Sequence, residues 1–588
     1  MNNKFDKEKS LYCFWLNFFS EIWKAISSKR RIQVIALIFL NVFSAFADIL
    51  SLASLIPFLS FLLSPDKFSK YFPAIFQELP SSTQFILICS SYFFVTVIAG
   101  LVRMANLWLN NKVSFTLGSD IGRKIYIQTL SQDYEYLSKV STSEFVDMLI
   151  KKGDALVSGG IIPTVQLLSS GLVVIFTVSL LLYVSPMVTV SLIIFMTFIY
   201  VMILKINRKA MRINSSALSQ KSSQLIQIIQ EAILCKVEIT LYQKQKYFTN
   251  KYYEIDYFLR GLESQNQFYM HSPKIAIETI GIIIIGFIAI YYNSIDSDAS
   301  SYIPLLATFA LAAQKLLPNL QQIYAAVVNI STRSATLENV IASLQLIPQD
   351  LNRSLDINNL DFFWKYIKFE NIGYQYENNS YPTFSQANFT INRGDRIGII
   401  GVSGGGKTTL AKIIMGLKNP TFGNIYLDNK ISNGLNFLDW YSQLAYVPQI
   451  IPILNTSIIE NIAFGYTASE IDLARAISAA KDSGLSIDIE KFIDGYKSTV
   501  GEFGSKLSGG QKLKLGLARA LYRGAKLLVL DEYTSALDKD TEKEIVDVIG
   551  KLSKNITIIV ISHRPEAMLF CQKFIKVDQG KITNIDEI

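Results

Sequence analysis

Six long apolar stretches, separated by polar connections, constrain the fold of this chain more than any other feature. They cover about residues 32–64, 84–109, 160–184, 187–205, 272–292 and 302–328. A helix needs roughly 20 apolar residues to cross the hydrocarbon core of a bilayer, and each stretch is about that long or longer. Because a backbone in lipid must satisfy its own hydrogen bonds, we expect six membrane-spanning helices.

The composition is typical of a membrane protein. Half of the 588 residues are hydrophobic, the mean hydropathy is +0.29 and the formal net charge is +8. The basic residues lie mostly between the apolar stretches, which favours an anionic membrane surface as their partner. The apolar stretches themselves exclude a soluble protein that acts on nucleic acid. The scattered cysteines show neither metal-ligand spacing nor a disulfide framework, and the two histidines cannot form a metal centre alone.

The polar connections predict the orientation in the membrane. Basic residues precede the first stretch and fill two long connections, 110–159 and 206–271, whereas the opposite connections are short or acidic. We therefore expect a multi-pass protein of the cell (inner) membrane with its N-terminus and C-terminal half in the cytoplasm. The long connections have helical periodicity, so the helices should continue into the cytoplasm. They should turn near Tyr134–Glu144 and Glu231–Gln243, where they would touch a cytoplasmic domain.

Two aromatic segments flank the first stretch. The N-terminal segment is not a cleavable signal, because Glu21 and Lys24 interrupt its apolar residues. Its aromatic side chains indicate an amphipathic helix in the membrane interface, with an ordinary core helix as the alternative. The aromatic spacing in Pro65–Ser82 indicates either a short amphipathic helix on the outer face or an irregular loop that dips into the membrane.

A glycine-rich loop defines the chemistry of the C-terminal half. It consists of Gly401, Val402, Ser403, Gly404, Gly405, Gly406, Lys407, Thr408 and Thr409. The apolar run Ile397–Ile400 precedes it as a buried strand, and Leu410–Leu417 follows with helical spacing. Strand, loop and helix in this order match a phosphate-binding P-loop, whose backbone N–H groups close around phosphates. Lys407 would reach the β- and γ-phosphates, and Thr408 would ligate Mg²⁺.

Further motifs follow in a fixed order that is more specific than any one of them. Tyr376 can stack on an adenine ring, and Gln449 can offer its amide to Mg²⁺ and to an attacking water. A buried aliphatic strand ends in two carboxylates, of which Asp531 would hold Mg²⁺ and Glu532 would polarise the water. His563 follows another aliphatic run, where it can hydrogen-bond a γ-phosphate. A second glycine-bearing loop, suited to a γ-phosphate, consists of Leu507, Ser508, Gly509, Gly510 and Gln511.

This series resembles the ATP-binding cassette, and residues from about 10 to 585 resemble an ABC exporter half-transporter. In that family the matching motifs are Walker A (Gly401–Thr409), the Q-loop (Gln449), the exporter-specific loop (Thr499–Glu502), the signature (Leu507–Gln511), Walker B with its catalytic glutamate (Asp531, Glu532), the D-loop (Ser535–Asp538) and the switch histidine (His563). The resemblance implies an α-helical membrane domain of six long transmembrane helices, followed by a C-terminal α/β P-loop NTPase domain.

The resemblance also implies the domain limits, the cofactors and the partner. We expect an N-terminal elbow helix (1–28), a transmembrane domain (29–330), a linker (331–360) and the cassette (361–588). ATP and Mg²⁺ are the implied cofactors, and a homodimer would place each P-loop opposite the signature of the other chain. Lys512–Lys514 and Tyr533 depart from the family pattern but remove no catalytic group, so we expect an active ATPase.

The substrate leaves fewer traces in the sequence. Asp48, Arg103, Glu278 and Lys315 are ionisable residues within or near apolar stretches, where such groups face a cavity, pair between helices or snorkel. Arg103 and Lys315 are the candidate substrate residues, since Lys315 could attract a pyrophosphate.

The membrane half is similar to bacterial flippases of lipid-linked oligosaccharides in three features. They are the acidic residue in the first stretch, the outer segment after it, and the basic residue before Leu316-Leu317-Pro318. This similarity implies that the protein flips a polyprenyl-pyrophosphate glycan. Export of a peptide, a drug or another lipid is the alternative. A membrane-bound regulatory ATPase that transports nothing is a third interpretation.

Overall fold

The computed structural model describes most of the chain, in two compact units. The described residues are 11–54, 58, 61, 80–184, 186–295, 299–346, 364–376, 381–428, 430–431, 437–535, 537–578 and 580–585. The first unit comprises Met1–Gln132 and Tyr136–Gln349, and the second comprises Asp133–Glu135 and Asp350–Ile588. Nearly all of the outer segment predicted at Pro65–Ser82 lies outside the described residues.

The described residues of the first unit form helices that are joined by short turns. Its helices are α1 (Leu11–Ala25), α2 (Ser28–Ala53), α6 (Ser81–Leu130), α7 (Tyr134–Lys139), α8 (Thr142–Asp147), α9 (Gly153–Leu156), α10 (Ile162–Val184), α11 (Pro186–Leu234), α12 (Lys236–Leu241), α13 (Gln245–Ile295) and α14 (Ala299–Leu344), with π-helical turns η2 (Met148–Lys152) and η3 (Val157–Ile161).

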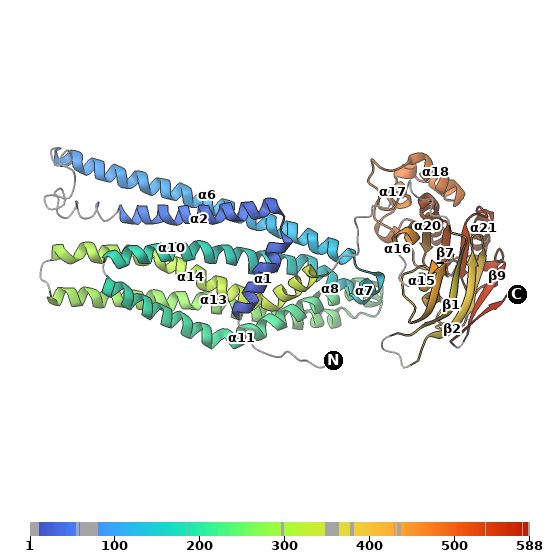
Figure 1. Ribbon diagram of the computed structural model, residues 1–588, viewed down its shortest axis with the longest axis horizontal. Coiled ribbons are helices and arrows are strands. Elements are labelled where there is room, and N and C mark those ends of the chain that lie inside the picture. Colours follow the sequence, from blue (N-terminus) through green and yellow to red (C-terminus); the bar gives the residue numbers. More distant parts are fainter. Residues whose placement is uncertain are drawn as a thin grey trace. The chain divides into compact units, whose positions relative to one another are not determined.

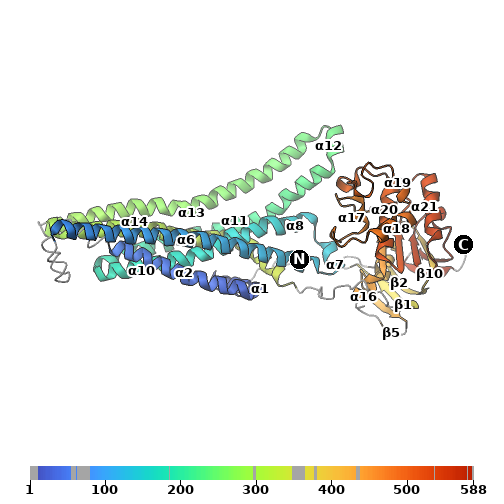
Figure 2. The ribbon, with the colours of Figure 1, turned by 90° about the horizontal axis from the view of Figure 1, so that it is seen from above.

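Six long helices lie at the six predicted membrane spans and run side by side (Figure 1). The first span, 32–64, is covered by α2 only as far as Ala53, and most of the rest of it lies outside the described residues. The helices α11 and α13 diverge from the others toward the short α12 (Figure 2). Among the described residues, three stretches are both long and apolar enough to cross a membrane, namely Ser28–Ala53, Ser82–Leu130 and Thr142–Tyr183. The long helices also break where the sequence predicted turns, at α7 and at α12.

The last helix of this unit is longer than the sequence predicted. Residues 331–344 were assigned to a linker, but they continue α14 without a break. Leu337, Val340 and Ile341 are buried here, next to Phe18 and Ile121. Their spacing of three and four residues forms an apolar stripe, which packs this end of the helix against its neighbours. The rest of the predicted linker, from residue 347, lies outside the described residues.

The helical stretch Thr142–Val184 contains the two π turns. They flank the short α9. Just before the first π turn, Asp147 is 1% exposed and accepts hydrogen bonds from Ser222 (2.7 Å) and Ser223 (2.9 Å) on α11. Lys152 Nζ lies 3.6 Å from the same carboxylate. π turns are rare overall, but those that do occur are often at functional sites. This stretch therefore differs from a regular α-helical span.

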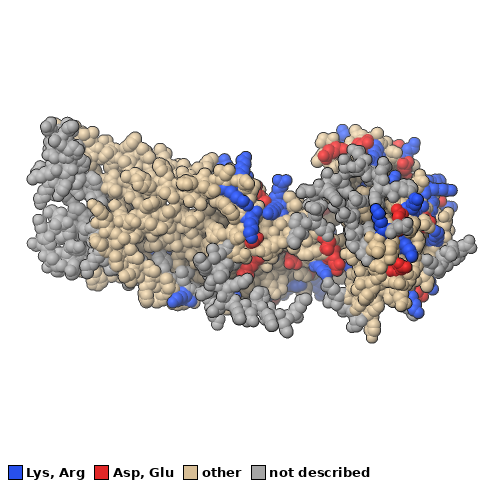
Figure 3. Space-filling view, in the orientation of Figure 1, with Lys and Arg blue, Asp and Glu red and all other residues tan. Residues whose placement is uncertain are grey.

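The surface of the helical unit carries many large apolar side chains. Phe94 is 68% exposed, Met104 72% and Phe198 65%. Figure 3 shows a broad uncharged surface over much of the described helical part, and mixed charges over the second unit. Water penalises an apolar surface of this extent, whereas the hydrocarbon of a bilayer does not.

The second unit contains two sheets. Its strands are β1 (Tyr366–Tyr374), β2 (Phe384–Asn392), β3 (Arg396–Gly401), β4 (Phe422–Leu427), β5 (Lys430–Ile431), β6 (Leu444–Val447), β7 (Leu527–Asp531), β8 (Thr557–Ile561), β9 (Lys573–Asp578) and β10 (Lys581–Ile585). The antiparallel sheet has the order β2-β1-β4-β5, and the larger sheet has the order β10-β9-β3-β8-β7-β6. Strands β9, β3, β8, β7 and β6 are parallel, and β10 is antiparallel.

Seven α-helices accompany these sheets in the described residues. They are α15 (Lys407–Ile414), α16 (Phe437–Ser442), α17 (Ile458–Ile462), α18 (Leu473–Asp482), α19 (Ser486–Ile489), α20 (Gly509–Arg523) and α21 (Lys539–Lys551), with 3-10 turns at Gly495–Lys497, Glu502–Gly504 and Pro565–Met568. The strands β7 and β8 are buried along their whole length, as parallel strands covered on both faces must be. The carboxyl ends of β3, β7 and β8 therefore meet at one edge, where α/β sheets bind ligands.

Candidate functional site

The glycine-rich loop joins the end of β3 to α15, as the sequence predicted. Gly401 has φ 149°, and a Cβ there would lie 2.0 Å from the carbonyl oxygen of Val577. Gly406 caps α15 with φ 102°, and a Cβ there would lie 2.9 Å from Thr383. Any larger residue would displace the backbone at Gly401, which fixes the shape of the loop. The helix then begins at Lys407 with its N–H groups directed at the loop.

Lys407 is held over this loop. Its Nζ donates to the carbonyl oxygens of Gly401 (3.0 Å) and Val402 (2.9 Å), and the residue is 7% exposed. Thr408 is exposed, whereas Thr409 is buried. A buried ammonium beside a ring of backbone N–H groups can bind a phosphate chain.

Asp531 ends β7 on the same edge of the sheet and is 6% exposed. Burial raises the pKa of its carboxyl group, and the Tyr446 hydroxyl, which donates to Oδ2 at 3.1 Å, acts in the opposite direction. Burial, followed by the charge of Asp531, raises the pKa of Tyr446 as well, so the phenol stays a donor. Asp531, Thr408 and Gln449 each carry a side-chain oxygen, which is the kind of ligand that Mg²⁺ prefers.

Glu532 follows with a left-handed backbone, φ 43°, which is uncommon for a residue with a Cβ. Its Oε2 accepts from Gln449 Nε2 at 3.1 Å, and its Oε1 lies 3.7 Å from His563 Nδ1. Three predicted catalytic residues from three separate segments are thus in contact. Strained backbone of this kind is concentrated at active sites, because the surrounding structure holds the side chain in place. The next residue, Tyr533, is buried and donates to the carbonyl oxygen of Ala567 (2.8 Å), so this departure from the family pattern is a packed core residue.

Tyr376 is 38% exposed and its hydroxyl lies 2.9 Å from Thr409 Oγ1. Beside it lies Lys418, which the sequence did not single out. Lys418 Nζ lies 4.8 Å from the Tyr376 ring centroid and 4.7 Å from that of Tyr374, and it donates to the Tyr374 hydroxyl. Burial lowers the pKa of Lys418, but the hydrogen bond and charge of Tyr374 outweigh it, so the pKa is raised. A buried cation therefore supports the candidate adenine-stacking ring.

The predicted signature loop lies at the start of α20. Ser508 and Gln511 form a reciprocal capping box, in which the Ser508 hydroxyl accepts from Gln511 N and the Gln511 Oε1 accepts from Ser508 N. Leu507 is buried, and Gly509 and Gly510 begin the helix. This arrangement fixes the helix N-terminus, which favours an anion.

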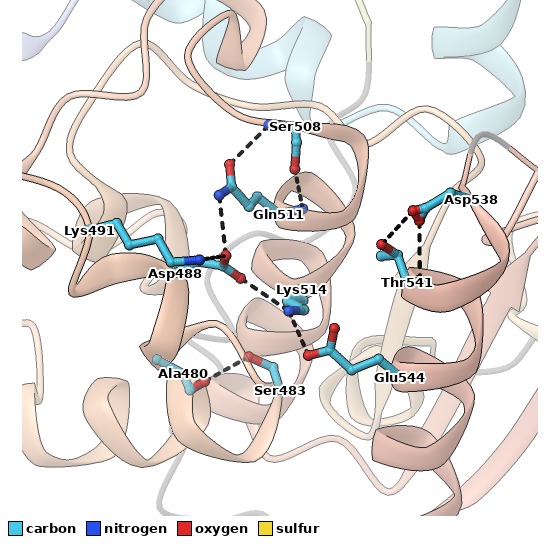
Figure 4. Close-up of polar contacts among 10 residues, drawn as sticks. All are labelled: Ala480, Ser483, Asp488, Lys491, Ser508, Gln511, Lys514, Asp538, Thr541 and Glu544. Atoms are coloured by element: carbon cyan, nitrogen blue, oxygen red, sulfur yellow. Dashed lines mark hydrogen bonds and ion pairs between the residues drawn. The ribbon is translucent and has the colours of Figure 1, made fainter.

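A buried cation also supports this loop (Figure 4). Lys514 Nζ donates to Asp488 (3.1 Å) on α19 and to Glu544 (2.8 Å) on α21, and Gln511 Nε2 donates to Asp488 at 3.3 Å. The two ion-paired hydrogen bonds raise the pKa of Lys514 despite its burial, which acts to lower it. The sequence marked Lys514 only as a departure from the family, because nothing local shows which carboxylates reach it.

The predicted D-loop precedes α21. Asp538 caps that helix and accepts from the Thr541 backbone (3.2 Å) and hydroxyl (2.9 Å). A Cβ on Gly510 would lie 2.7 Å from Thr541 Cγ2, so the signature helix and the D-loop helix are in direct contact. In the described cassette, no hydrogen bond or ion pair joins the signature loop to the P-loop.

The structure describes the side chain of one of the two candidate substrate residues, Arg103, but not that of the other, Lys315. Arg103 Nε lies 3.3 Å from Asp48 Oδ1, so these ionisable residues pair between α6 and α2. Lys315 belongs to α14, but its side chain lies outside the described residues. Glu278 pairs with Lys274 at 3.8 Å along α13.

Comparisons with known proteins agree with this division of the chain. Residues 34–256 match the family of the ABC transporter transmembrane region, and residues 384–535 match the ABC transporter cassette family. A protein of Wigglesworthia glossinidia brevipalpis named ATP-dependent lipid A-core flippase is 25% identical over 98% of this chain and 95% of its own length. A protein of the same name from Ralstonia nicotianae is 33% identical over 40% of this chain and 39% of its own length.

A solved structure of a bacterial Atm1-family ABC exporter with ATP bound shares the fold. Its TM-score is 0.77 at 18% identity, over 94% of both chains. A helical transmembrane domain is thus followed by an α/β cassette with a P-loop and a carboxylate pair. The protein is an ABC half-transporter and hydrolyses ATP to drive transport.

Proposed function

We propose that this membrane protein flips a lipid-linked oligosaccharide between the leaflets of the cell (inner) membrane, with its N-terminus and cassette in the cytoplasm. It works as a homodimer in which each P-loop faces the signature loop of the other chain. The lack of any hydrogen bond between the two loops within the described cassette is consistent with a site completed by a second copy. ATP would draw the cassettes together and its hydrolysis would release them, driving alternating access.

The residues of the site have separate roles in this proposal. Lys407 and the loop N–H groups bind the β- and γ-phosphates, and Tyr376 stacks on the adenine. Thr408, Asp531 and Gln449 hold Mg²⁺, which neutralises phosphate charge when bound. Glu532 accepts the proton of the attacking water. His563, whose Nδ1 lies 3.7 Å from that carboxylate, would hydrogen-bond the γ-phosphate.

The observation that carries the substrate class is the pair formed by Arg103 and Asp48 within the spanning helices. Charged groups in such helices are costly and face a cavity or a partner, so this pair suits a lipid with an ionic headgroup. Lys315 would supply positive charge for a pyrophosphate. The name of the Wigglesworthia relative, which aligns along nearly the whole chain, also favours a glycolipid.

That same name supports a second candidate, a lipid A-core glycolipid. Both candidates join acyl or prenyl chains to phosphate and sugar, so the same charges would serve either. Export of a peptide or drug, and a regulatory role without transport, have no comparable support in the described residues.

Reconstitution in proteoliposomes tests the proposal. Each candidate lipid, labelled on its sugar, is incorporated, and the label in the inner and outer leaflets is compared with and without ATP. We expect ATP-dependent movement of the polyprenyl-pyrophosphate glycan, reduced in Arg103→Ala and Lys315→Ala. Movement of lipid A-core alone would support the second candidate, and movement of neither would refute a glycolipid flippase. The control is Lys274→Ala, since among the described residues Lys274 has a single, long ion pair along its own helix.

A further inference from the structure

A polar cavity lies within the helical unit, between α2, α6, α10 and α14. Its volume is about 280 Å³. That is close to the lower end of small-molecule sites, about 300–1,000 Å³, so it has room for one small group of a larger substrate. Most of its lining residues carry amides or hydroxyls, and no aromatic residue is among its described lining.

One wall is an asparagine cluster, which we define as Asn41, Asn106 and Asn110. Asn41 Oδ1 accepts from Asn106 (2.9 Å) and from Asn110 (3.1 Å), and Asn110 also donates to Asn106 Oδ1 (3.2 Å). Asn41 is 3% exposed and Asn106 8% exposed. The cluster joins α2 to α6, so its amides are fixed in place before anything binds.

The opposite wall comes from α10 and α14. Ser170, 2% exposed, donates to Gln322 Oε1 at 2.6 Å. This hydrogen bond uses the carbonyl oxygen of the Gln322 amide, so the amide nitrogen remains as a donor. Both walls thus present neutral groups that can donate and accept.

The spacing of the polar residues shows that they form stripes on the helices. Asn106, Asn110 and Ser114 recur every four residues on α6, and Asn41, Ser44 and Asp48 recur at three and four on α2. Hydrogen bonds between polar side chains contribute little to the stability of packed spanning helices. Polar residues from four helices that line one cavity, two of them in regular stripes, therefore point to a ligand rather than to packing.

The net charge of the lining residues indicates which chemical class of ligand the cavity can bind. Its ionised lining residues, Asp48 and Arg103, neutralise each other at 3.3 Å. A site for phosphate alone would need an excess of positive charge. A site rich in amides and hydroxyls with no net charge instead matches a ligand that is dense in hydroxyl groups, each of which both donates and accepts.

We infer that this cavity binds the sugar hydroxyls of the transported headgroup, with the asparagine cluster and Gln322 as hydrogen-bonding residues. The inference rests on the proposed function and assigns the carbohydrate part of the substrate to these four helices. The charged pair at Asp48 and Arg103 would sit where the sugar meets the anionic part of the lipid.

The test compares two lipids in full-length protein in nanodiscs. One is a polyprenyl diphosphate that carries a single sugar, and the other is the same polyprenyl diphosphate without it. Half-saturating concentrations for ATPase stimulation are measured in wild type and in Asn106→Leu, Gln322→Leu and Ser170→Ala. We expect each variant to need about 2–10-fold more of the glycosylated lipid, as for one lost hydrogen bond, with little change for the bare lipid. Equal changes for both lipids, or none, would overturn the inference.

Asn214→Leu is the matched control. Asn214 is buried and donates to Asn266 at 3.0 Å between α11 and α13, outside the cavity, so it should leave both half-saturating concentrations unchanged. If neither lipid stimulates the wild type, the proposed function fails, and the inference is tested by NMR saturation transfer to the free monosaccharide. Signal that survives in Asn106→Leu and Gln322→Leu would then refute the cavity as a sugar site.

Discussion

The polar groups of the cassette and those of the helical cavity are organised in opposite ways. In the cassette, Asp531, Glu532, Lys407 and His563 are ionisable, and they gather at the ends of three neighbouring strands. In the cavity, neutral amides come from all four helices, with between one and three on each helix. The cassette concentrates function in a few charges, whereas the cavity distributes it over many weak contacts. Loss of one residue should therefore be severe in the first and mild in the second.

The largest effect is expected for Glu532→Gln. The variant loses the group that accepts a proton from water, so ATP hydrolysis should fall about 10²–10⁴-fold, while ATP binding is retained. Steady-state ATPase and nucleotide titration measure the two quantities. Wild-type turnover would remove Glu532 from its proposed role and weaken the contrast between the two regions.

Lys514→Met tests a buried charge that lies outside the proposed nucleotide contacts. Its loss should lower the stability of the cassette, whereas the loss of Glu532 should lower the rate of hydrolysis. The side chain is 8% exposed and pairs with Asp488 and Glu544, and the latter is half-exposed. We expect a loss of about 2–3 kcal/mol in cassette stability, below the usual range for a buried pair because of that exposure. Lys514→Arg should retain the stability. Denaturant unfolding measures it.

The control for that experiment is Lys491→Met. Lys491 lies 3.8 Å from the same Asp488 but is 71% exposed, so its loss should cost under about 0.5 kcal/mol. Equal losses in Lys491→Met and Lys514→Met would contradict the assignment of Lys514 as the supporting cation.

A smaller effect is expected for Lys418→Leu. Its ammonium supports the ring of Tyr376, and removal should weaken ATP binding about 2–5-fold with little effect on the maximal hydrolysis rate. Lys368→Leu is the control, since that ammonium lies 5.8 Å from a different ring, Tyr426. An unchanged ATP dissociation constant in Lys418→Leu would exclude the supporting role.

The smallest effect is expected for a neutral group of the cassette, in Tyr446→Phe. The hydroxyl lowers the pKa of Asp531, which burial raises, so the variant should raise that pKa further. In its proposed role Asp531 must be ionised to hold Mg²⁺, and the acid limb of the ATPase pH profile should therefore move to higher pH. Tyr441→Phe loses a hydroxyl that donates to the Gly416 carbonyl oxygen and should leave the limb in place. If the acid limb of the pH profile does not move in Tyr446→Phe, then a group other than Asp531 determines its position.

Local motifs explain why so much of the cassette could be predicted. The residues of each motif determine its local backbone conformation, as the glycines with positive φ at 401 and 406 do for the P-loop. Such a motif can be recognised without knowing which distant residues pack against it. Lys418 and Lys514 were missed because their partners are distant in sequence, and only packing brings them together. The ends of helices were less certain, because the apolar stripe that extends α14 to Leu344 depends on Phe18 and Ile121.

The cavity illustrates a different difficulty. Asp48 and Arg103 were noticed because a charge in an apolar stretch is conspicuous, and the structure pairs them. The asparagines of the cavity were not noticed from the sequence, because a single asparagine in an apolar stretch does not by itself indicate a binding site. The spacing of four residues between Asn106, Asn110 and Ser114 was the available sign. The roles assigned to the site residues and the domain limits stay predictions.

The two π turns before α10 affect where this protein can tolerate insertions and deletions during evolution. Each π turn accommodates about one residue more than an α turn. A one-residue deletion within Val157–Ile161 can be absorbed as the turn tightens, and Ser170 keeps facing the cavity. The same deletion within α10 rotates everything beyond it by about 100°. Insertions and deletions should therefore collect at these turns among descendants of a common ancestor, while the cavity lining persists.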